Sequence, residues 1–287
     1  MKNVIFTINV EIEDSKLDNP ASFESSGIQK KSDKSLITKT QFQKYHNQLI
    51  NAQRSYADSI GADYFVCNND DSYKKFLTML SDYPQISEYD AINFYKHYLM
   101  KKLSEKYDQI CYLDLDVVPN TNENIFEAFD LSKSFACAES NDQAEYGKTC
   151  SPQDYNMCIR NPASKYWNCH AMLLEAGEKP DTDVFNTGIM VASSDIIQKL
   201  DYFGNFTELL NLMTELKSDE FSMYPKNIRR VFGYDNETVF AYKRVINKID
   251  VEYMDSIWHA VVVEKQIPNP NAKMWHIINK RFDEVFK

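Results

Sequence analysis

Three short apolar segments, separated by two stretches of helical periodicity, constrain the fold of this chain more than any other feature. Residues 1–9, 63–67 and 109–113 each read as a β-strand. Apolar residues recur three or four positions apart over residues 40–60 and 91–103, which is the spacing of one helix face. Strands that alternate with helices predict a parallel sheet with helices packed on it, and ligands bind outside the carboxyl ends of such strands.

The connections between these segments carry signals of their own. Glu11 to Lys39 is polar, shows no period and reads as a long surface loop. Gly61 suits the end of a helix, and Ser87 followed by Asp90 matches a helix start. We therefore expect one α/β domain.

Charge and hydropathy exclude several classes of partner. The net charge of −10 disfavours nucleic acid, because phosphates are bound by basic surfaces. No apolar run approaches the roughly 20 residues of a membrane helix, so we expect no transmembrane segment. Residues 1–9 are too short for a signal peptide. We expect a cytoplasmic protein whose six cysteines are free thiols.

The strand over residues 109–113 leads directly into Asp114-Leu115-Asp116. Side chains alternate along an extended chain, so both carboxylates point the same way. Two charged carboxylates together at the ligand end of a strand need a compensating charge, and oxygen ligands of this kind favour Mn²⁺ or Mg²⁺. The competing interpretation is an exposed turn that happens to contain two aspartates.

Several segments resemble motifs of the GT-A glycosyltransferases, above all family 8. Tyr107–Val118, which reads YDQICYLDLDVV, resembles the Asp-x-Asp strand of that family, and Lys96 lies on the preceding helix as its donor-contacting basic residue does. Asp183–Val191 resembles the family's FNxGxM strand, Tyr234–Phe240 its DQD helix start, and Trp275-His276 its late metal-binding histidine. The segments occur in the family's order and span most of the chain.

The resemblance implies a single GT-A domain, a Rossmann-like α/β fold whose mostly parallel central sheet is flanked by helices, over residues 1–287. Residues 1–120 would form the nucleotide-binding half, and residues 121–287 the acceptor-binding half with a C-terminal tail. It also implies transfer of a sugar from a nucleotide-diphosphate sugar to a glycan or another hydroxyl acceptor. A UDP-sugar and retention of configuration are favoured.

The resemblance also assigns roles to the polar residues. Asp114, Asp116 and His276 would hold Mn²⁺ or Mg²⁺, with Asp114 also close to the donor ribose. His276 could instead be a structural histidine, and His259 is the competing ligand.

Four further residues are expected to bind the donor. Thr7 and Asn9 end the first strand, where this fold receives the nucleotide base, while Lys96 and Lys280 would contact the rest of the donor.

Three residues are predicted to act at the reacting centre. Asn186 offers an amide, and Gly188 beside it lets substrate approach the backbone, although a simple strand bulge would use the same residues. Asp183 stands just upstream. Asp235 would sit at a helix N-terminus, either as a plain N-cap or also as a catalytic group.

The end of the chain departs from the family pattern. The late motif His-x-x-Gly-x-x-Lys becomes a histidine followed by Asn279, Lys280 and Arg281. Because we expect these basic residues to lack partners until metal and diphosphate arrive, we predict that residues 271–287 close over the bound donor. Truncation before Met274 should then spare the fold.

Other functions remain as alternatives. A sugar nucleotidyltransferase usually needs a glycine-rich loop after its first strand, and residues 9–26 contain no glycine. A degenerate sugar- or nucleotide-binding module would not need both aspartates. Self-glycosylation on one of the 18 tyrosines is possible. A zinc site at Cys150, Cys158, Cys169 and His170 is rejected because their spacing matches no common zinc pattern.

Overall fold

The structure is a computed structural model. It describes residues 1–13, 31–84, 86–140, 162–218, 220, 222–224, 229, 233–263 and 268–286.

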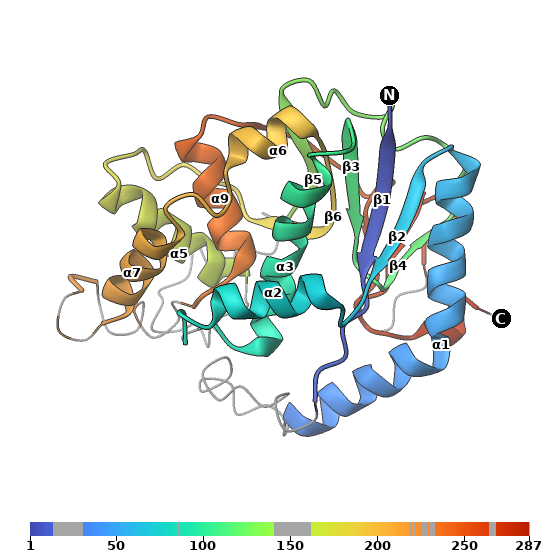
Figure 1. Cartoon of the computed structure of the whole chain (residues 1–287), viewed down its shortest axis with the longest axis horizontal. Helices are drawn as coiled ribbons and strands as arrows, with labels where there is room; N and C mark the ends of the chain where they lie inside the picture. The colour runs from blue at the N-terminus through green and yellow to red at the C-terminus, as the bar shows by residue number, and fades with distance from the viewer. Residues whose placement is uncertain are drawn as a thin grey trace.

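A 6-stranded sheet in the order β2-β1-β3-β6-β5-β7 forms the centre of the molecule (Figure 1). Its strands are β1 (Asn3–Ile8), β2 (Asp63–Cys67), β3 (Gln109–Leu113), β5 (Ser134–Glu139), β6 (Phe185–Ser193) and β7 (Asp250–Tyr253). All of them run in one direction except β6, which is antiparallel to both neighbours. The prediction of a mostly parallel sheet is confirmed.

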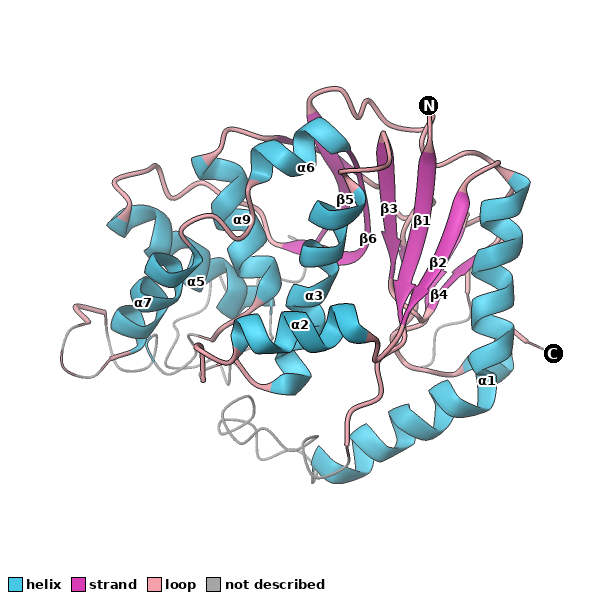
Figure 2. Ribbon diagram, viewed as in Figure 1, coloured by secondary structure: helices cyan, strands magenta, loops and turns pink. Residues whose placement is uncertain are grey.

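Helices lie on the sheet and at its two ends. They are α1 (Lys31–Ser59), α2 (Asp71–Leu80), α3 (Glu88–Leu103), α5 (Pro162–Glu175), α6 (Ser194–Leu200), α7 (Phe206–Lys217) and α9 (Asn236–Ile246), followed by the short 3₁₀ helix η3 (Phe282–Glu284). Figure 2 shows α1 beside the edge strand β2, with α5, α7 and α9 together at the opposite end of the molecule. In the part of the chain that is described, no helix combines the length and apolar character needed to cross a bilayer.

Alternation along the central strands creates two apolar cores. In β3, Ile110 and Tyr112 face the core that includes residues of α2, α3, α6, α7 and α9. Cys111 and Leu113 face the second core, which includes the C-terminal end of α1. Because β3 is buried on both faces, its residues 110–113 form a continuous apolar run. The run stops at Asp114, the first residue after the strand.

A second, 3-stranded sheet in the order β4-β9-β8 joins distant parts of the chain. It consists of β4 (Val117–Pro119), β8 (Ala260–Val261) and β9 (Met274–His276). β4 follows the Asp-Leu-Asp segment directly, and its antiparallel register sets Val117 opposite His276.

The predicted strands and helices of the first 113 residues are present. The loop predicted from Glu11 to Lys39 is wrong for its last part, because α1 already begins at Lys31. Extending an existing helix avoids the cost of nucleation, so weakly patterned residues can join one that packing stabilises. Helix α2 was missed, although its N-cap Asp70 and the buried residues Tyr73 and Phe76 carry a helical signal.

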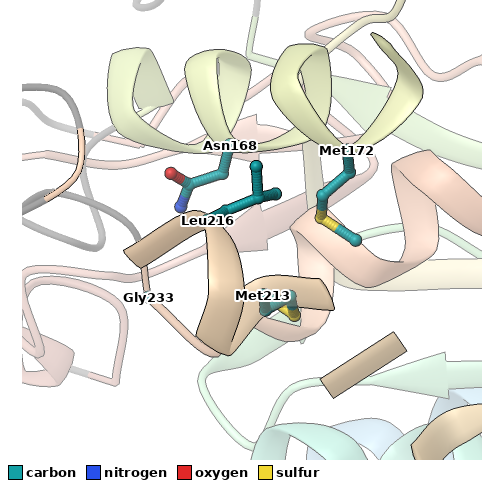
Figure 3. Close-up of a pocket in the computed structure, with 5 residues that line it drawn as sticks. All are labelled: Asn168, Met172, Met213, Leu216 and Gly233. Carbon is teal, nitrogen blue, oxygen red and sulfur yellow. The ribbon is translucent and has the colours of Figure 1, made fainter. Parts of the chain in front are cut away.

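A small pocket lies between α5 and α7 (Figure 3). It is lined by Asn168, Met172, Met213, Leu216 and Gly233. None of the predicted site residues is among these, and the lining is mostly apolar.

Candidate active site

A tight turn after β3 presents the two aspartates. The amide of Val117 donates to the carbonyl oxygen of Asp114 at 2.9 Å, which closes the turn. The amide of Asp114 donates to the carbonyl oxygen of Gly188 at 2.7 Å and so fixes the turn to β6. Asp116 is only 4% exposed, whereas the Asp114 side chain is partly open. The turn therefore holds one carboxylate inside the protein and leaves the other accessible.

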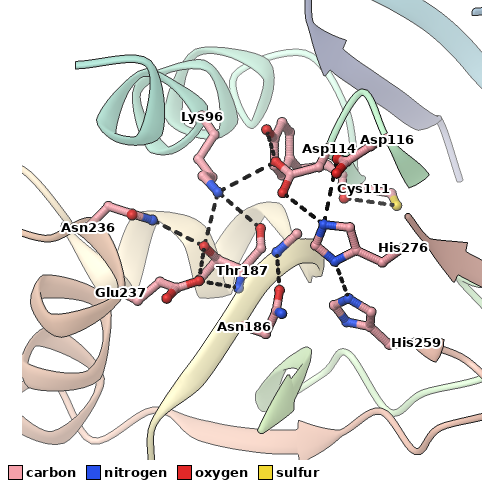
Figure 4. Close-up of polar contacts among 12 residues, drawn as sticks. Lys96, Cys111, Asp114, Asp116, Asn186, Thr187, Asn236, Glu237, His259 and His276 are labelled. Carbon is pink, nitrogen blue, oxygen red and sulfur yellow. Dashed lines mark hydrogen bonds and ion pairs between the residues drawn. The ribbon is translucent and has the colours of Figure 1, made fainter. Parts of the chain in front are cut away.

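The register of β4 with β9 brings His276 to these carboxylates. Its Nε2 lies 3.5 Å from Oδ2 of Asp114 and 3.6 Å from Oδ1 of Asp116. Figure 4 shows the three side chains turned toward one another. The structure thus brings together the three residues predicted as cation ligands, which are separated by some 160 residues of chain.

This donor set fits a divalent cation. One ligand atom from each residue can be chosen so that all lie within 4.8 Å of one another. Oxygen ligands about 2.1 Å from a common Mg²⁺ lie about 3 Å apart when adjacent and about 4.2 Å apart when opposite. The observed separations are close to these values, and two carboxylates with one imidazole suit Mn²⁺ or Mg²⁺ chemistry.

Gly188 lies so close to the triad that a side chain at this position would not fit. A Cβ at this position would lie 2.3 Å from Cε1 of His276 and 3.0 Å from Oδ2 of Asp114. The glycine is therefore required by the close approach of His276 and Asp114. The predicted approach of substrate to its backbone stays a prediction. The neighbouring bulge between Cys137 and Ala138 shows that the strand irregularity is present as well.

Each carboxylate of the pair has a cationic neighbour. Nζ of Lys96 lies 3.8 Å from Asp114, and Lys280 forms an ion pair with Oδ2 of Asp116. Burial raises the pKa of Asp116, but Lys280 and His276 outweigh it and hold the pKa below its ordinary value. The expectation that the two aspartates need a metal to relieve their charge is therefore too simple.

Two buried groups orient the triad. The hydroxyl of Tyr112 donates to Oδ1 of Asp114 at 2.5 Å. Nε2 of His259 lies 2.9 Å from Nδ1 of His276, and both rings are buried. For Nε2 of His276 to bind a cation, its Nδ1 must carry the proton and donate a hydrogen bond to Nε2 of His259. His259 thus contacts the ligand histidine and is not itself a member of the triad.

A second polar cluster surrounds Thr187, one residue before Gly188. Lys96, only 2% exposed, donates to the Oγ1 of Thr187 at 3.0 Å and to its carbonyl oxygen at 3.1 Å. Nδ2 of Asn236 donates to the same Oγ1 at 3.1 Å, and Oε1 of Glu237 lies 3.1 Å from it. The hydroxyl therefore accepts two hydrogen bonds and donates one, which uses its full capacity.

Glu237 extends this cluster toward α5. Its Oε1 accepts the amide of Thr187 at 2.8 Å, and Oε2 pairs with Lys165. Burial raises the pKa of Glu237, but the ammonium groups of Lys165 and Lys96 with two hydrogen bonds bring the net value below 4.5. Lys165 also lies 3.9 Å from Oδ1 of Asp235. A chain of alternating charges connects Asp235 to the triad through Lys96.

The residues predicted to act at the reacting centre have structural partners. Asp235 is the N-cap of α9, and its Oδ2 accepts the amide of Thr238 at 2.8 Å, as one of its two interpretations requires. Oδ1 of Asn186 accepts the amide of Gly188 at 2.9 Å. Asp183 accepts from the hydroxyl of Tyr253.

The predicted base contacts lie at the carboxyl end of β1. Thr7 is fully buried, and its Oγ1 has no hydrogen-bond partner among the residues that the structure describes. Nδ2 of Asn9 lies 3.0 Å from Nε2 of His46 and 3.2 Å from Oδ1 of Asn68.

The premise of a closing tail is wrong. Lys280 pairs with Asp116, and Arg281 pairs with Glu284, so both basic groups have partners within the chain. Phe282 is fully buried against Tyr45 and Leu49 of α1. Residues 274–286 thus form part of a core, and truncation before Met274 is now expected to destabilise the fold. Closure on donor binding stays a prediction.

Sequence reasoning missed several residues that complete the site. Gln53 and Lys165 lie outside every motif. Tyr112, Thr187 and Glu237 lie within the family-like segments but were given no role there, because their roles follow from side-chain contacts in the folded site. Of the rejected zinc cluster, Cys150 and Cys158 lie outside the described residues. Within the described residues, the triad is the one group of acidic, histidine and cysteine side chains that could hold a metal.

The sequence model of Glycosyl transferase family 8 matches residues 13–224, well over half of the chain. The chain belongs to glycosyl transferase family 8. The predicted family and enzyme class are thereby confirmed, and this protein is a glycosyltransferase. The match ends before α9 and β9, so it does not include Asp235 or His276. These two residues are assigned to the site from their positions in the structure.

Solved glycosyltransferases of low sequence identity resemble this family 8 chain. Mouse xyloside xylosyltransferase 1 in its apo form has 11% identity and a TM-score of 0.47, over 97% of this chain and 98% of that one. A glycosyltransferase involved in glycosylation of the major capsid of PBCV-1 has 13% identity and a TM-score of 0.43, with 100% of both chains covered. Galactosyltransferase LgtC with donor and acceptor sugar analogs has 11% identity and a TM-score of 0.42, over 96% of this chain and 87% of that one. No curated protein matches the sequence.

Proposed function

We propose that this glycosyltransferase moves a sugar from a nucleotide-diphosphate sugar, with UDP-sugars favoured, to a hydroxyl of a glycan or another acceptor. We propose further that the reaction depends on Mn²⁺ or Mg²⁺. The observation that carries the proposal is the triad of Asp114, Asp116 and His276, which gathers two carboxylates and an imidazole beside Gly188, with the Asp114 side chain partly exposed.

The chain's own charges suit a departing diphosphate. A bound divalent cation would supply Lewis-acid stabilisation of the negative charge on the leaving group. Lys280 is partly exposed and can turn from Asp116 to a phosphate oxygen. Lys96 is enclosed and held by Thr187, so it contributes a fixed positive charge beside Asp114. Preorganised charges of this kind stabilise a transition state without reorganisation.

The remaining assignments are part of the same proposal. Asp183, Asn186 and Asp235 are proposed to contact the transferred sugar or the acceptor, and Thr7 and Asn9 to lie near the nucleotide base. Retention of configuration is proposed because family 8 membership favours it.

A cytoplasmic location is also proposed. Its support is that Cys67, Cys111, Cys137 and Cys169 are free thiols in the described part of the chain. In addition, Asn236 of the sequon Asn236-Glu237-Thr238 is buried, and a glycan could not be attached there in the folded protein.

The test is a screen of UDP- and GDP-sugars for slow hydrolysis with Mn²⁺, followed by addition of EDTA. We expect hydrolysis of one donor class that stops with EDTA and returns with Mn²⁺ or Mg²⁺. Full activity in EDTA would overturn the cation assignment. Release of pyrophosphate from a sugar phosphate and a nucleoside triphosphate would favour a nucleotidyltransferase, and a mass increase of the intact protein would reveal self-glycosylation.

A further inference from the structure

A buried amide on α1 contacts both ends of the turn that carries the aspartates. Gln53 is 0% exposed. Its Nε2 donates to the carbonyl oxygen of Asp114 at 2.9 Å and to that of Val117 at 2.8 Å. Its Oε1 accepts from the hydroxyl of Tyr64 at 3.0 Å. Nitrogen faces two acceptors and oxygen faces a donor, so the orientation of the amide is determined by its partners.

We propose that Gln53 is a positioning residue of the cation site, which sets the separation of Asp114, Asp116 and His276 without contacting the cation. The proposal rests on the proposed function. Gln53 contacts backbone carbonyl oxygens of the turn, whereas Oδ2 of Asp114 and the ring of His276 lie next to Gly188.

The contacts of the turn explain how one amide can act on all three ligands. Asp114 and Val117 are the first and last residues of the turn, and Asp116 lies between them. Val117 also opens β4, where it pairs with His276 of β9. The amide of Ile277 donates to the carbonyl oxygen of Asp116 at 2.9 Å. A change in the separation of the two carbonyl oxygens therefore moves both carboxylates relative to the histidine.

Without the Gln53 amide, the carbonyl oxygen of Asp114 keeps the amide of Val117, but the carbonyl oxygen of Val117 loses the Gln53 donor. A buried acceptor that loses its donor costs about 1–3 kcal/mol, so the turn would rotate to recover a partner. Partners behind metal ligands typically change metal affinity by about 10- to 100-fold when they are removed. A purely structural amide would lower stability and leave the cation affinity of the folded protein unchanged.

Two variants of the full chain separate these roles. Gln53→Met keeps the length of the side chain and removes both donors. Gln53→Asn keeps the amide but is too short to reach both carbonyl oxygens, and serves if the first variant does not fold. The matched control is Asn168→Leu, whose buried amide bridges the carbonyl of Ser164 and the amide of Gly233 in its better orientation, away from the triad.

The measurement is the dissociation constant of Mn²⁺ without donor, from the electron paramagnetic resonance signal of free Mn²⁺, with a thermal melt of each variant. We expect Gln53→Met to weaken Mn²⁺ binding by about 10-fold or more and Gln53→Asn by less, with Asn168→Leu within about twofold of wild type. Wild-type affinity in a folded Gln53 variant, or an equal loss in Asn168→Leu, would overturn the proposal. No Mn²⁺ binding by the wild type would overturn the proposed cation site, and the role of Gln53 with it.

Discussion

Two polar clusters meet at residues 187 and 188 of β6, and they differ in how their hydrogen-bonding capacity is used. Around Thr187, the hydroxyl accepts from Lys96 and Asn236 and donates to Glu237, so it has nothing left to offer a ligand. In the triad, Tyr112 and Lys280 each donate to one oxygen of Asp114 and Asp116, respectively. The other oxygen of each carboxylate lies 3.5 to 3.6 Å from Nε2 of His276, so three electron-pair donors face the same point. The first arrangement suits a support, and the second suits a binding site.

The difference teaches which residues should affect activity and which should affect stability. A saturated buried network loses free energy of folding when one member is removed, because its partners become unsatisfied. Residues that bind a ligand are needed for the chemistry of the bound state. Replacing one of them should therefore reduce activity more than it reduces the free energy of folding. Five substitutions test this distinction.

The largest effect is expected from Asp116→Asn. Loss of one charged ligand should reduce transfer by about 1,000-fold or more, since cation stabilisation of a leaving diphosphate is worth several kcal/mol. Lys280 loses its partner but can reach water, so the melting temperature should fall only slightly. Because Asp116 forms an ion pair with Lys280, relief of repulsion between the two carboxylates is not expected to stabilise the variant. A fully unfolded variant would instead show that Asp116 is needed mainly for folding.

Gly188→Ala should come next, with about a 100-fold loss of activity. The new Cβ would lie 2.3 Å from His276 Cε1, so the imidazole must shift, and displacements of about 1 Å cost activity on that scale. Gly177→Ala is the matched control: its φ is +72° and nothing lies within 4 Å of the new Cβ, so it should cost stability but not turnover. Equal turnover of both variants would contradict the close approach.

Thr187→Val should act mainly on the fold. Lys96, Asn236 and Glu237 each lose a partner in a buried site, and we expect a loss of about 1–3 kcal/mol in the free energy of unfolding, measured by denaturant titration. Thr187→Ser restores the hydroxyl and should recover most of it. If Thr187→Val leaves stability unchanged but removes activity, Thr187 acts in ligand binding, and the distinction between a structural cluster and a binding site is wrong.

Glu237→Gln should change how stability depends on pH. The folded protein holds the pKa of Glu237 below 4.5, so the unfolded chain takes up the proton more readily. The stability from this carboxylate is therefore present above about pH 4.5 and is lost as pH falls through the folded pKa. As pH falls below about 4.5, wild-type stability should decline more steeply than that of the variant. Parallel curves would show that Glu237 is not stabilised as an anion.

The smallest effect is expected from Lys280→Met. Its ammonium group competes with a cation for Asp116, so removing it should tighten binding of Mn²⁺ alone by roughly threefold to tenfold. Binding of UDP with Mn²⁺ should weaken, because the proposed phosphate contact is lost. Lys273→Met, which removes a surface pair with Glu123, should change neither constant. Weaker binding of Mn²⁺ alone would contradict the competition.

The sequence by itself determined what depends on neighbours along the chain. Alternation over residues 109–113 set the two faces of β3, and the abrupt change to Asp114 and Asp116 marked the ligand end of the sheet. Asp235 at the start of α9 was readable because an N-cap acts within three residues. Such signals are local, so one segment suffices to detect them.

The tertiary structure decided the contacts between distant segments. Which histidine joins the carboxylates depends on the pairing of β4 with β9, which sets His276 opposite Val117 and leaves His259 behind it. Gln53 carries no motif, and its role follows only from the packing of α1 against the turn. The physical reason is that strand register and helix packing are fixed by the burial of whole faces, and no single residue along the chain encodes them.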